Sequence, residues 1–469
     1  MMTFQQKIKE VPGLLYVAES MEFMSYSGRR CMMEQPFLTD AAAIDTSQED
    51  VAIMRSVLSN DEYALALNKL RHQLMQLHDL QTSLASLGSH VVLEEVELFE
   101  IKVFAHLCSY ARQALEAMQL AGRFPLPDLQ PVFDLLDPDG TGIPTFYVYD
   151  SYDIRLIPLR RRMKEVDEVE MATLLVEQNE IQQQVITRLC DQLHPYTDAL
   201  TSALEQMSYI DFTLARAVLA DAWQLVPPAT QAGEADRLTG QPASRQTFHQ
   251  LVNPRLKQHN EAIGMRYQPV DIDLTEGVTL ITGANMAGKT VLLKSVGTAQ
   301  LMYQFGFPVP CSHAVMEPVD DVVFCIGDEQ NEMNGLSSFA SEITRISDVL
   351  RRSANERLLV LIDEPARTTN PIEGKALVQA IVTLMQQHDS ITLITTHYSQ
   401  LGVACRRLRV KGFVESMVDT SLTAQNINRF IDYSLVPDES DEVPQEALRI
   451  AEMLQCDPTL LSTAREFLN

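Results

Sequence analysis

Residues 278–290 read VTLITGANMAGKT, and the helix-like run VLLKSVGTAQLMYQFG follows directly at 291–306. The central part, Gly283–Thr290, matches the pattern G-x-x-x-x-G-K-[ST] in the context that this pattern requires, an apolar strand before it and a helix after it. In such a loop, backbone N–H groups and the helix N-terminus surround phosphate oxygens, and glycines allow close approach of the backbone. The stretch therefore predicts a phosphate-binding P-loop with ATP as its ligand.

The residues of this loop have separate expected roles. Lys289 is expected to reach the β- and γ-phosphates, and Thr290 is expected to offer its hydroxyl to Mg²⁺. The residues predicted to bind the nucleotide are those of the loop and the first helical turn: Gly283, Ala284, Asn285, Met286, Ala287, Gly288, Lys289, Thr290 and Val291.

A second motif, LLVLIDEP at 358–365, is an apolar strand that ends in two carboxylates. After a P-loop, this arrangement predicts that Asp363 belongs to the Mg²⁺ shell. Glu364 is then expected to be the general base that activates water for attack on the γ-phosphate. The alternative is an ordinary strand followed by an acidic turn, but the preceding P-loop favours the catalytic interpretation.

A third apolar run, ITLITTHYSQ at 391–400, carries His397 to the end of a strand. The carboxyl ends of parallel strands meet at one edge of a sheet, so this histidine is expected beside the nucleotide. There it can hydrogen-bond the γ-phosphate or the attacking water, which makes it the second predicted catalytic residue. A single histidine is more often structural, but its place after the third strand of a nucleotide fold favours the catalytic role.

The fourth motif, NGLSSFASEI at 334–343, contains a Gly-x-Ser-Ser turn that opens a helix. Free N–H groups and hydroxyls at a helix start form an anion-binding geometry, so Ser337 and Ser338 are predicted to contact a phosphate. Because the chain already has its own P-loop, this second phosphate-binding turn is expected to serve a neighbouring subunit. The motif thus predicts a homodimer with composite sites of the ABC type, the alternative being a serine helix cap without a ligand.

The composition of the chain and the spacing of its apolar residues change near residue 224. Apolar residues at helical spacing run through much of 1–223, for example over 61–87 and in one long polar helix over 155–193. A segment rich in Pro, Gly and Ala follows at 227–246, and short β-branched strands then alternate with helices. We therefore expect a helical domain at 1–223 and an α/β P-loop NTPase domain, similar to the ABC ATPases, at 224–469.

Charge limits the function classes. The 37 basic and 63 acidic residues leave a net charge of −26, which excludes a protein that coats nucleic acid unaided. Arg160, Arg161, Arg162 and Lys164 form a basic run, but acidic residues follow at once in Glu165, Asp167, Glu168 and Glu170. A solvated helix with opposite charges one turn apart is favoured over a nucleic-acid patch.

Other features point to the cytoplasm and away from bound structural metals. Seven scattered cysteines without a C-x-x-C pair fit a reducing compartment. No apolar run of about 18 residues and no signal peptide are visible, so no membrane association is expected. The insert 122–144 contains Asp137, Asp139 and Gly142 in the manner of a calcium loop, but Val148 stands where that loop needs a glutamate, which favours a plain turn.

The residues of these motifs and their order along the chain resemble the ATPase domain of the MutS family. They resemble the MutS-II branch more closely than the classical mismatch-recognition proteins. The tracts that carry the resemblance are ITGANMAGKTVLLKSVGTAQLMYQFGFPVP (281–310), IGDEQ (326–330), GLSSF (335–339), DEPARTTNPIEGKAL (363–377), THYSQL (396–401) and ALRIAEML with LLSTAREFL near the C-terminus. The helical region from about residue 15 to 223 resembles the MutS core and lever more weakly. The resemblance implies ATP hydrolysis with Mg²⁺ and a dimeric architecture.

The chain also departs from that family. Ala284 and Ala287 stand where the family loop has Pro and Gly. The mismatch-recognition domains and the nuclease-like Smr domain find no counterpart in 469 residues, and the clamp insertion is shortened. We therefore do not expect this chain to share the family's mismatch recognition or nuclease activity, but we do expect it to bind ATP.

Three functions remain open at this point. The first is a DNA-associated ATPase of the repair or recombination type, in which nucleotide turnover drives a conformational clamp. The second is an ATP-dependent remodeller or reactivase of a protein client, for example a cobalamin-dependent aminomutase, with no role on DNA. The third, a ribosome-splitting ATPase, lacks the expected basic elements. The acidic charge favours the second and the family resemblance favours the first.

Overall fold

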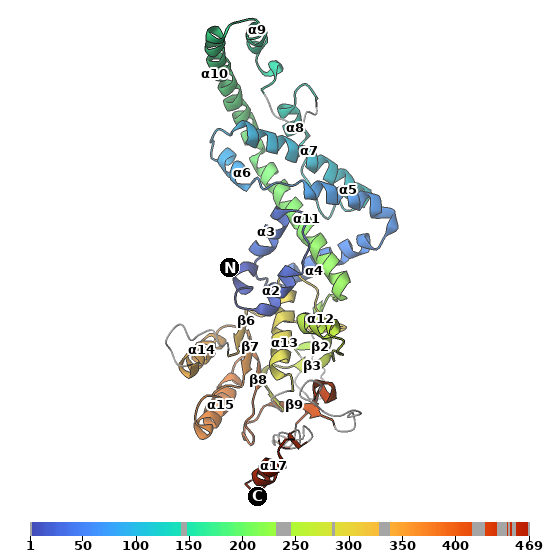
Figure 1. The fold of residues 1–469 in the computed structure, drawn as a ribbon, viewed down its shortest axis with the longest axis vertical. Coiled ribbons are helices and arrows are strands. Elements are labelled where there is room, and N and C mark those ends of the chain that lie inside the picture. The colour runs from blue at the N-terminus through green and yellow to red at the C-terminus, as the bar shows by residue number, and fades with distance from the viewer. Residues whose placement is uncertain are drawn as a thin grey trace. The chain divides into compact units, whose positions relative to one another are not determined.

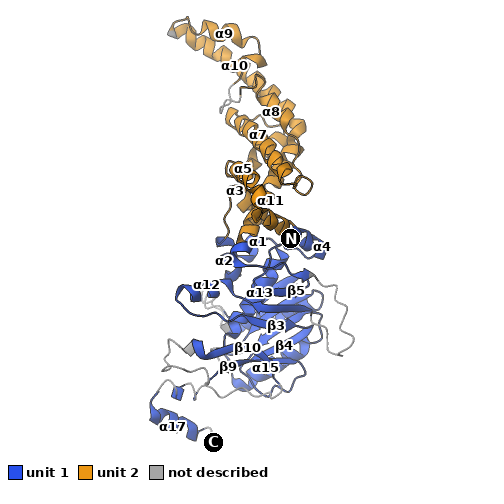
Figure 2. Ribbon diagram, turned by 90° about the vertical axis from the view of Figure 1, so that its right-hand side faces the viewer, with its two compact units in different colours: residues 1–20, 36–49, 220–469 blue, residues 21–35, 50–219 orange. Residues whose placement is uncertain are grey.

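The computed structural model describes residues 2–141, 148–230, 245–283, 287–327, 338–414, 427–438, 448, 451–452 and 456–467. The chain forms two compact units, coloured separately in Figure 2. The first consists of residues 1–20, 36–49 and 220–469, and the second of residues 21–35 and 50–219. No helix of the described residues is long and apolar enough to cross a membrane.

A six-stranded sheet forms the centre of the first unit, within its described part. The strand order is β10 (Ile431–Pro437), β9 (Arg406–Phe413), β4 (Gly277–Thr282), β8 (Ile391–Thr395), β7 (Leu358–Asp363) and β6 (Asp321–Cys325). All neighbouring pairs are parallel except β10 with β9. Strands β4 and β8 are buried along their whole length, which agrees with their continuous apolar and β-branched sequence.

Helices cover both faces of this sheet (Figure 1). Leu358, Val360 and Ile362 of β7 pack with apolar residues of α14 (Ser338–Ser353) and α15 (Pro371–Met385). The intervening Leu361 points to the opposite face, where it lies against Gly297 of α13 (Lys289–Gln304). Since alternate strand residues face opposite sides, the sheet lies between α13 and the α14–α15 pair.

A smaller sheet precedes the P-loop strand. Its order is β1 (Ala229–Thr230), β5 (His313–Met316), β2 (Gln246–Leu251) and β3 (Val270–Leu274). Helix α12 (Pro254–Ala262) connects β2 to β3, and Asn253 caps its start. Near the C-terminus, α17 (Pro458–Glu466) is capped by Asp457.

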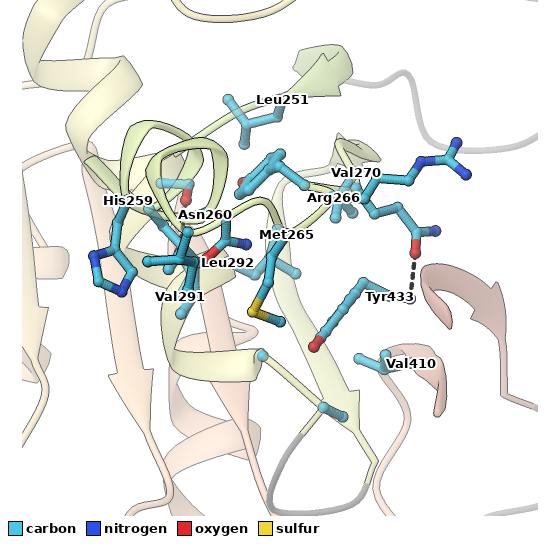
Figure 3. Close-up of a pocket in the computed structure, with 17 residues that line it drawn as sticks. Leu251, His259, Asn260, Met265, Arg266, Val270, Val291, Leu292, Val410 and Tyr433 are labelled. Carbon is cyan, nitrogen blue, oxygen red and sulfur yellow. Dashed lines mark hydrogen bonds between the residues drawn. The ribbon is translucent and has the colours of Figure 1, made fainter. Parts of the chain in front are cut away.

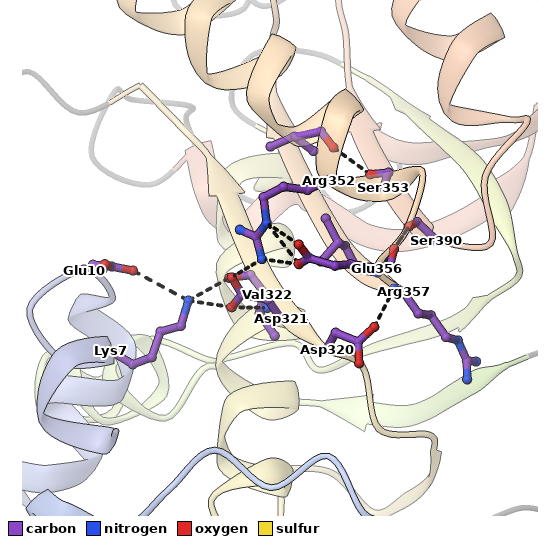
Figure 4. Close-up of polar contacts among 12 residues, drawn as sticks. Lys7, Glu10, Asp320, Asp321, Val322, Arg352, Ser353, Glu356, Arg357 and Ser390 are labelled. Atoms are coloured by element: carbon purple, nitrogen blue, oxygen red, sulfur yellow. Dashed lines mark hydrogen bonds and ion pairs between the residues drawn. The ribbon is translucent and has the colours of Figure 1, made fainter. Parts of the chain in front are cut away.

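The N-terminal helices α1 (Phe4–Lys7) and α2 (Pro12–Glu19) belong to the same unit as the sheet, not to the helical unit. Lys7 Nζ lies 2.8 Å from Asp321 Oδ1 at the start of β6, and Arg352 of α14 reaches the other oxygen of that carboxylate at 2.9 Å (Figure 4). Phe4 packs edge-on against Phe305. The two units therefore do not meet at one boundary near residue 224, as the expected domains 1–223 and 224–469 do. The N-terminal residues join the α/β unit because they contact its core.

The second unit is helical. Its elements are α3 (Tyr26–Glu34), the end of α4 (Ala41–Leu58), α5 (Ala64–Met75), α6 (Gln81–Gly88), α7 (Glu95–Ala117), α8 (Gln130–Leu136), α9 (Leu156–Arg162), α10 (Glu168–Leu193) and most of α11 (Thr197–Trp223). The expected single helix over 155–193 is wrong: it is divided into α9 and α10. The Asp167 side chain accepts hydrogen bonds from the N–H groups of Val169 and Glu170, which begins a new helix there.

Two charged segments of this unit have defined partners. Arg160 pairs with Asp150, and Arg162 pairs with Glu170. Asp137 is buried and its Oδ1 accepts hydrogen bonds from Thr141 N and Oγ1, which closes a turn. Gly142, the third residue of the calcium-like pattern, lies outside the described residues.

Candidate nucleotide-binding and catalytic site

The P-loop connects the end of β4 to the start of α13. Gly288, which precedes α13, has φ of +72°, and a Cβ atom there would lie 3.1 Å from the Tyr433 ring. The conformation therefore favours glycine here, and a larger residue would also require the Tyr433 ring to shift. Ala284, Asn285 and Met286 lie outside the described residues, so their predicted contacts remain predictions.

Lys289 begins α13 with a side chain that is almost completely buried. Its Nζ donates a 2.7 Å hydrogen bond to the Gly283 carbonyl and lies 3.5 Å from Glu364 Oε1. Taking an ammonium group out of water is costly unless partners compensate the charge. The Lys289 ammonium, at the start of α13, fits a bound phosphate as a further partner.

Thr290, Asp363 and Thr395 form a hydrogen-bonded group of oxygens. Thr290 Oγ1 donates to Asp363 Oδ2 at 2.6 Å, and Thr395 Oγ1 donates to Asp363 Oδ1 at 2.6 Å. Asp363 and Thr395 are aligned partners at the ends of the parallel strands β7 and β8. A hydroxyl and a carboxylate are oxygen ligands of the kind that Mg²⁺ prefers, so Thr290 and Asp363 fit this ion.

Glu364 follows directly in an unusual backbone conformation. Its φ is +44°, which costs about 1–3 kcal/mol for a residue with a side chain and is typical of functional sites. Its N–H donates to Thr395 O at 3.1 Å and to Thr395 Oγ1 at 3.0 Å. Its carboxylate lies between Lys289 and Arg367, whose Nη1 is 3.4 Å from Oε2.

His397 lies at the same edge of the sheet, after β8. Burial lowers the pKa of its imidazole below the usual value; Glu364 opposes this shift, while Lys289 and Arg367 add to it. The imidazole is therefore biased toward the neutral form, which can accept a hydrogen bond. The ring packs against Tyr398 with centroids 4.3 Å apart.

The predicted serine turn is only partly described. Ser337 lies outside the described residues, and Ser338 is the first residue of α14, where the position of its side chain is not described. The structure thus brings together Lys289, Thr290, Asp363, Glu364 and His397 at one edge of the sheet, whereas the serine contacts stay a prediction.

A cavity of about 410 Å³ opens beside the P-loop and was not anticipated from the sequence (Figure 3). Ala287 and Gly288 of the loop line it together with Val291 and Leu292 of α13. Ser295 of α13 also lines it. Its other walls come from β2, α12 and the segment after it, β3, β9 and β10: Leu251, Leu256, His259, Asn260, Ile263, Met265, Arg266, Tyr267, Gln268, Val270, Val410 and Tyr433. Most of these side chains are apolar or aromatic.

Tyr433 is held in this cavity wall by a small polar network. Gln268 Oε1 accepts a hydrogen bond from Tyr433 N at 3.2 Å (Figure 3). Gln268 Nε2 in turn donates to Asp432 Oδ1 at 2.8 Å. Burial raises the pKa of the Tyr433 phenol, which keeps its hydroxyl protonated. No sequence pattern indicated this wall, because its residues come from segments far apart in the chain.

The parallel sheet, the P-loop and the acidic strand end define an α/β P-loop domain. Comparison with known families then identifies it further: residues 279–469 match the family described as MutS domain V, a P-loop ATPase domain. Residues 279–469 of this chain therefore carry a MutS domain V.

Similar curated proteins lead to the same family. A protein named "Endonuclease MutS2" from Gemmatimonas aurantiaca is 32% identical over 336 residues, which are 70% of this chain and 36% of that protein. The protein of the same name from Agathobacter rectalis is 33% identical over 50% of this chain and 28% of its own. That from Lacticaseibacillus casei is 27% identical over 78% of this chain and 45% of its own. The chain thus spans less than half the length of these relatives.

Proposed function

We propose that the protein is a Mg²⁺-dependent ATPase in which nucleotide turnover at composite dimer sites drives a conformational change. The observation that carries this proposal is the placement of Lys289 and Glu364 beside the Thr290–Asp363 pair. A phosphate-binding ammonium, a pair of magnesium-type oxygens and a carboxylate base are the parts that phosphoryl transfer to water requires.

Each residue then has a defined task. Lys289 and the loop N–H groups bind the β- and γ-phosphates, while Thr290 and Asp363 hold Mg²⁺, which neutralises phosphate charge when bound. Glu364 accepts a proton from the water whose oxygen forms the new bond to the γ-phosphorus, and the bond from phosphorus to the β,γ-bridging oxygen breaks. Neutral His397 orients that water or the γ-phosphate by hydrogen bonding.

The cavity beside the P-loop is proposed as the site of the adenine base. Its apolar walls suit a flat ring, and Asn260 supplies a polar group for the ring edge. The loop residues Ala287 and Gly288 line the cavity, so a nucleotide with its phosphates in the loop can place its base there.

The larger architecture is also part of the proposal. By the family resemblance, the α/β unit acts as an ABC-type ATPase and the helical unit as a shortened core and lever. The Gly335–Ser338 turn would complete the site of a second copy of the chain, which gives a homodimer when ATP is bound.

The effector that the ATPase serves is proposed to be DNA, contacted weakly. The relatives carry the name endonuclease, which favours nucleic acid. In the described part of the basic run, however, Arg160 and Arg162 already pair with acidic residues, and the net charge is −26. Stimulation of turnover by a protein client instead of DNA is the alternative outcome of the same assay.

The test of the proposed activity compares Lys289→Ala and Glu364→Gln with the unmodified protein. Lys289→Ala removes the phosphate-facing charge and should abolish ATP binding. Glu364→Gln should bind ATP but lose turnover by on the order of 10²–10⁴-fold. Lys294→Ala, an exposed lysine of the same helix, is the matched control. Normal hydrolysis by Lys289→Ala would refute the proposal.

A further inference from the structure

Both polar backbone groups of Ala366 are held by side chains from other elements. Its N–H donates a 3.0 Å hydrogen bond to Glu342 Oε1 of α14. Its carbonyl accepts a 3.1 Å hydrogen bond from the Tyr398 hydroxyl, which follows β8. Ala366 itself is completely buried, so these two bonds connect α14 and the end of β8 to the loop after β7.

The conformation of this loop needs such support. Glu364 has φ of +44° and Ala366 has φ of +59°, so two residues with side chains lie in the left-handed region on either side of Pro365. Alanine and glutamate rarely adopt this conformation unless the surroundings impose it. The hydrogen bonds at Ala366 are therefore suited to keep the loop in the conformation that places the Glu364 carboxylate 3.5 Å from Lys289.

The first turn of α15 leaves space for the same contact. A Cβ atom at Gly374 would lie 2.2 Å from the Tyr398 hydroxyl oxygen and 3.0 Å from the Ala366 carbonyl oxygen. Any other residue at this position would have to push the two groups apart. The close approach of α15 thus depends on glycine and encloses the Tyr398–Ala366 bond.

Glu342 does not have the environment of a solvent-exposed helix residue. Its carboxylate is about half-buried, and burial raises its pKa although the bond from Ala366 N–H opposes the shift. A carboxylate that accepts a backbone N–H in a partly buried place forms a stronger bond than one in water. Glu342 lies one turn after Ser338, so α14 connects the predicted serine turn to the loop of Glu364.

We propose that Glu342 and Tyr398 are positioning residues that clamp Ala366 and thereby hold the Glu364 carboxylate in its catalytic position. This inference rests on the proposed ATPase function. The two hydrogen bonds at Ala366 involve no predicted magnesium ligand, and they act through the two peptide units that separate Ala366 from Glu364. The Tyr398 ring also packs against His397, and Tyr398→Phe keeps this ring while it removes the hydroxyl. Loss of the clamp should therefore reduce catalysis while nucleotide binding is kept.

The test uses Glu342→Ala, Glu342→Gln and Tyr398→Phe in the full chain. Glu342→Ala and Tyr398→Phe should each lower kcat by about tenfold to a hundredfold, the range expected when a catalytic group is misplaced by about 1 Å. The dissociation constant for ADP should change less than about twofold, because the P-loop is intact. Glu342→Gln retains an oxygen acceptor and should restore most of kcat. Thr344→Ala, an exposed position of α14, is the control.

A second measurement is independent of turnover. Hydrogen–deuterium exchange of peptides covering residues 364–370 should be faster in Glu342→Ala than in Thr344→Ala, because the Ala366 N–H loses its acceptor. Unchanged exchange, unchanged kcat in both clamp variants, or a parallel loss of ADP binding would overturn the clamp. Absence of turnover in the unmodified protein, or full turnover in Glu364→Gln, would instead overturn the proposed function.

Discussion

Thr395 Oγ1 donates a 2.6 Å hydrogen bond to Asp363 Oδ1 and accepts the N–H of Glu364 at 3.0 Å. One hydroxyl on β8 therefore orients both carboxylate residues at the end of β7. Neither motif predicts this contact, since the two strands are separated by α15 in the chain but are neighbours in the sheet.

Replacement of this hydroxyl should disturb the magnesium side of the site. We expect Thr395→Val, which keeps the shape of the side chain, to raise the Mg²⁺ concentration needed for half-maximal ATP turnover and to lower kcat, because Asp363 and Glu364 each lose a partner. Thr392→Val is a matched control on the same strand, since the buried Thr392 hydroxyl has no hydrogen-bond partner among the described residues. Equal magnesium dependence of the two variants would contradict this role.

Replacement of Tyr433 in the cavity wall should weaken binding of the adenine base but not binding of the phosphates. Tyr433→Ala should weaken ADP binding by about tenfold, equivalent to about 1.4 kcal/mol of lost aromatic contact. Pyrophosphate binding, measured by calorimetry under the same conditions, should change little, because the P-loop residues are untouched. A similar loss for both ligands would show that the cavity does not hold the base.

The N-terminal ion pair should contribute to the stability of the α/β unit. Lys7→Met removes the ion pair from buried Asp321, which then keeps Arg352 of α14 and the Val322 N–H as partners, and it should lower the free energy of unfolding by about 1–3 kcal/mol. Lys9→Met, at an exposed position two residues away, is the control. Chemical denaturation measures both, and equal midpoints would contradict a stabilising role for Lys7.

Composite sites make a prediction for mixed dimers. Lys289→Ala protein mixed with the double variant Ser337→Ala, Ser338→Ala should recover part of the turnover, because one of the two sites then combines an intact P-loop with intact serines. A mixture of Lys289→Ala and Glu364→Gln has a defect in each site and should not recover. A strictly monomeric Glu364→Gln protein with Mg-ATP, measured by light scattering, would argue against the dimer.

Binding of the protein to DNA should be weak and should depend little on whether the DNA is matched, mismatched or branched. Each phosphate contact needs a basic residue, and at about 150 mM salt we expect duplex affinity no tighter than about micromolar, with no preference for mismatches. Salt titrations with matched, mismatched and branched duplexes measure this. Nanomolar affinity with a steep salt dependence would show that basic residues converge on one surface despite the net charge of −26.

The local motifs were sufficient to predict that Lys289, Thr290 and Asp363 lie together at one edge of the sheet, beside Glu364. The P-loop and the acidic strand end are continuous stretches, and the physics of phosphate and magnesium binding demands particular residue types at fixed spacing within them. The order of strands and helices likewise predicted an α/β sheet, since apolar β-branched runs alternate with helical ones. His397 could be placed at the same edge because parallel strands end together.

Contacts between distant segments decided the rest. The cavity wall, the Thr395–Asp363 bond and the Ala366 contacts each join residues that no periodicity relates, and Lys7 meets Asp321 across more than half of the chain. The boundary between α9 and α10 depended on whether the Asp167 side chain would cap a helix or remain solvated. A sequence pattern records the local preference of a segment, whereas the free energy of burying and pairing its side chains depends on which partners the fold brings to them.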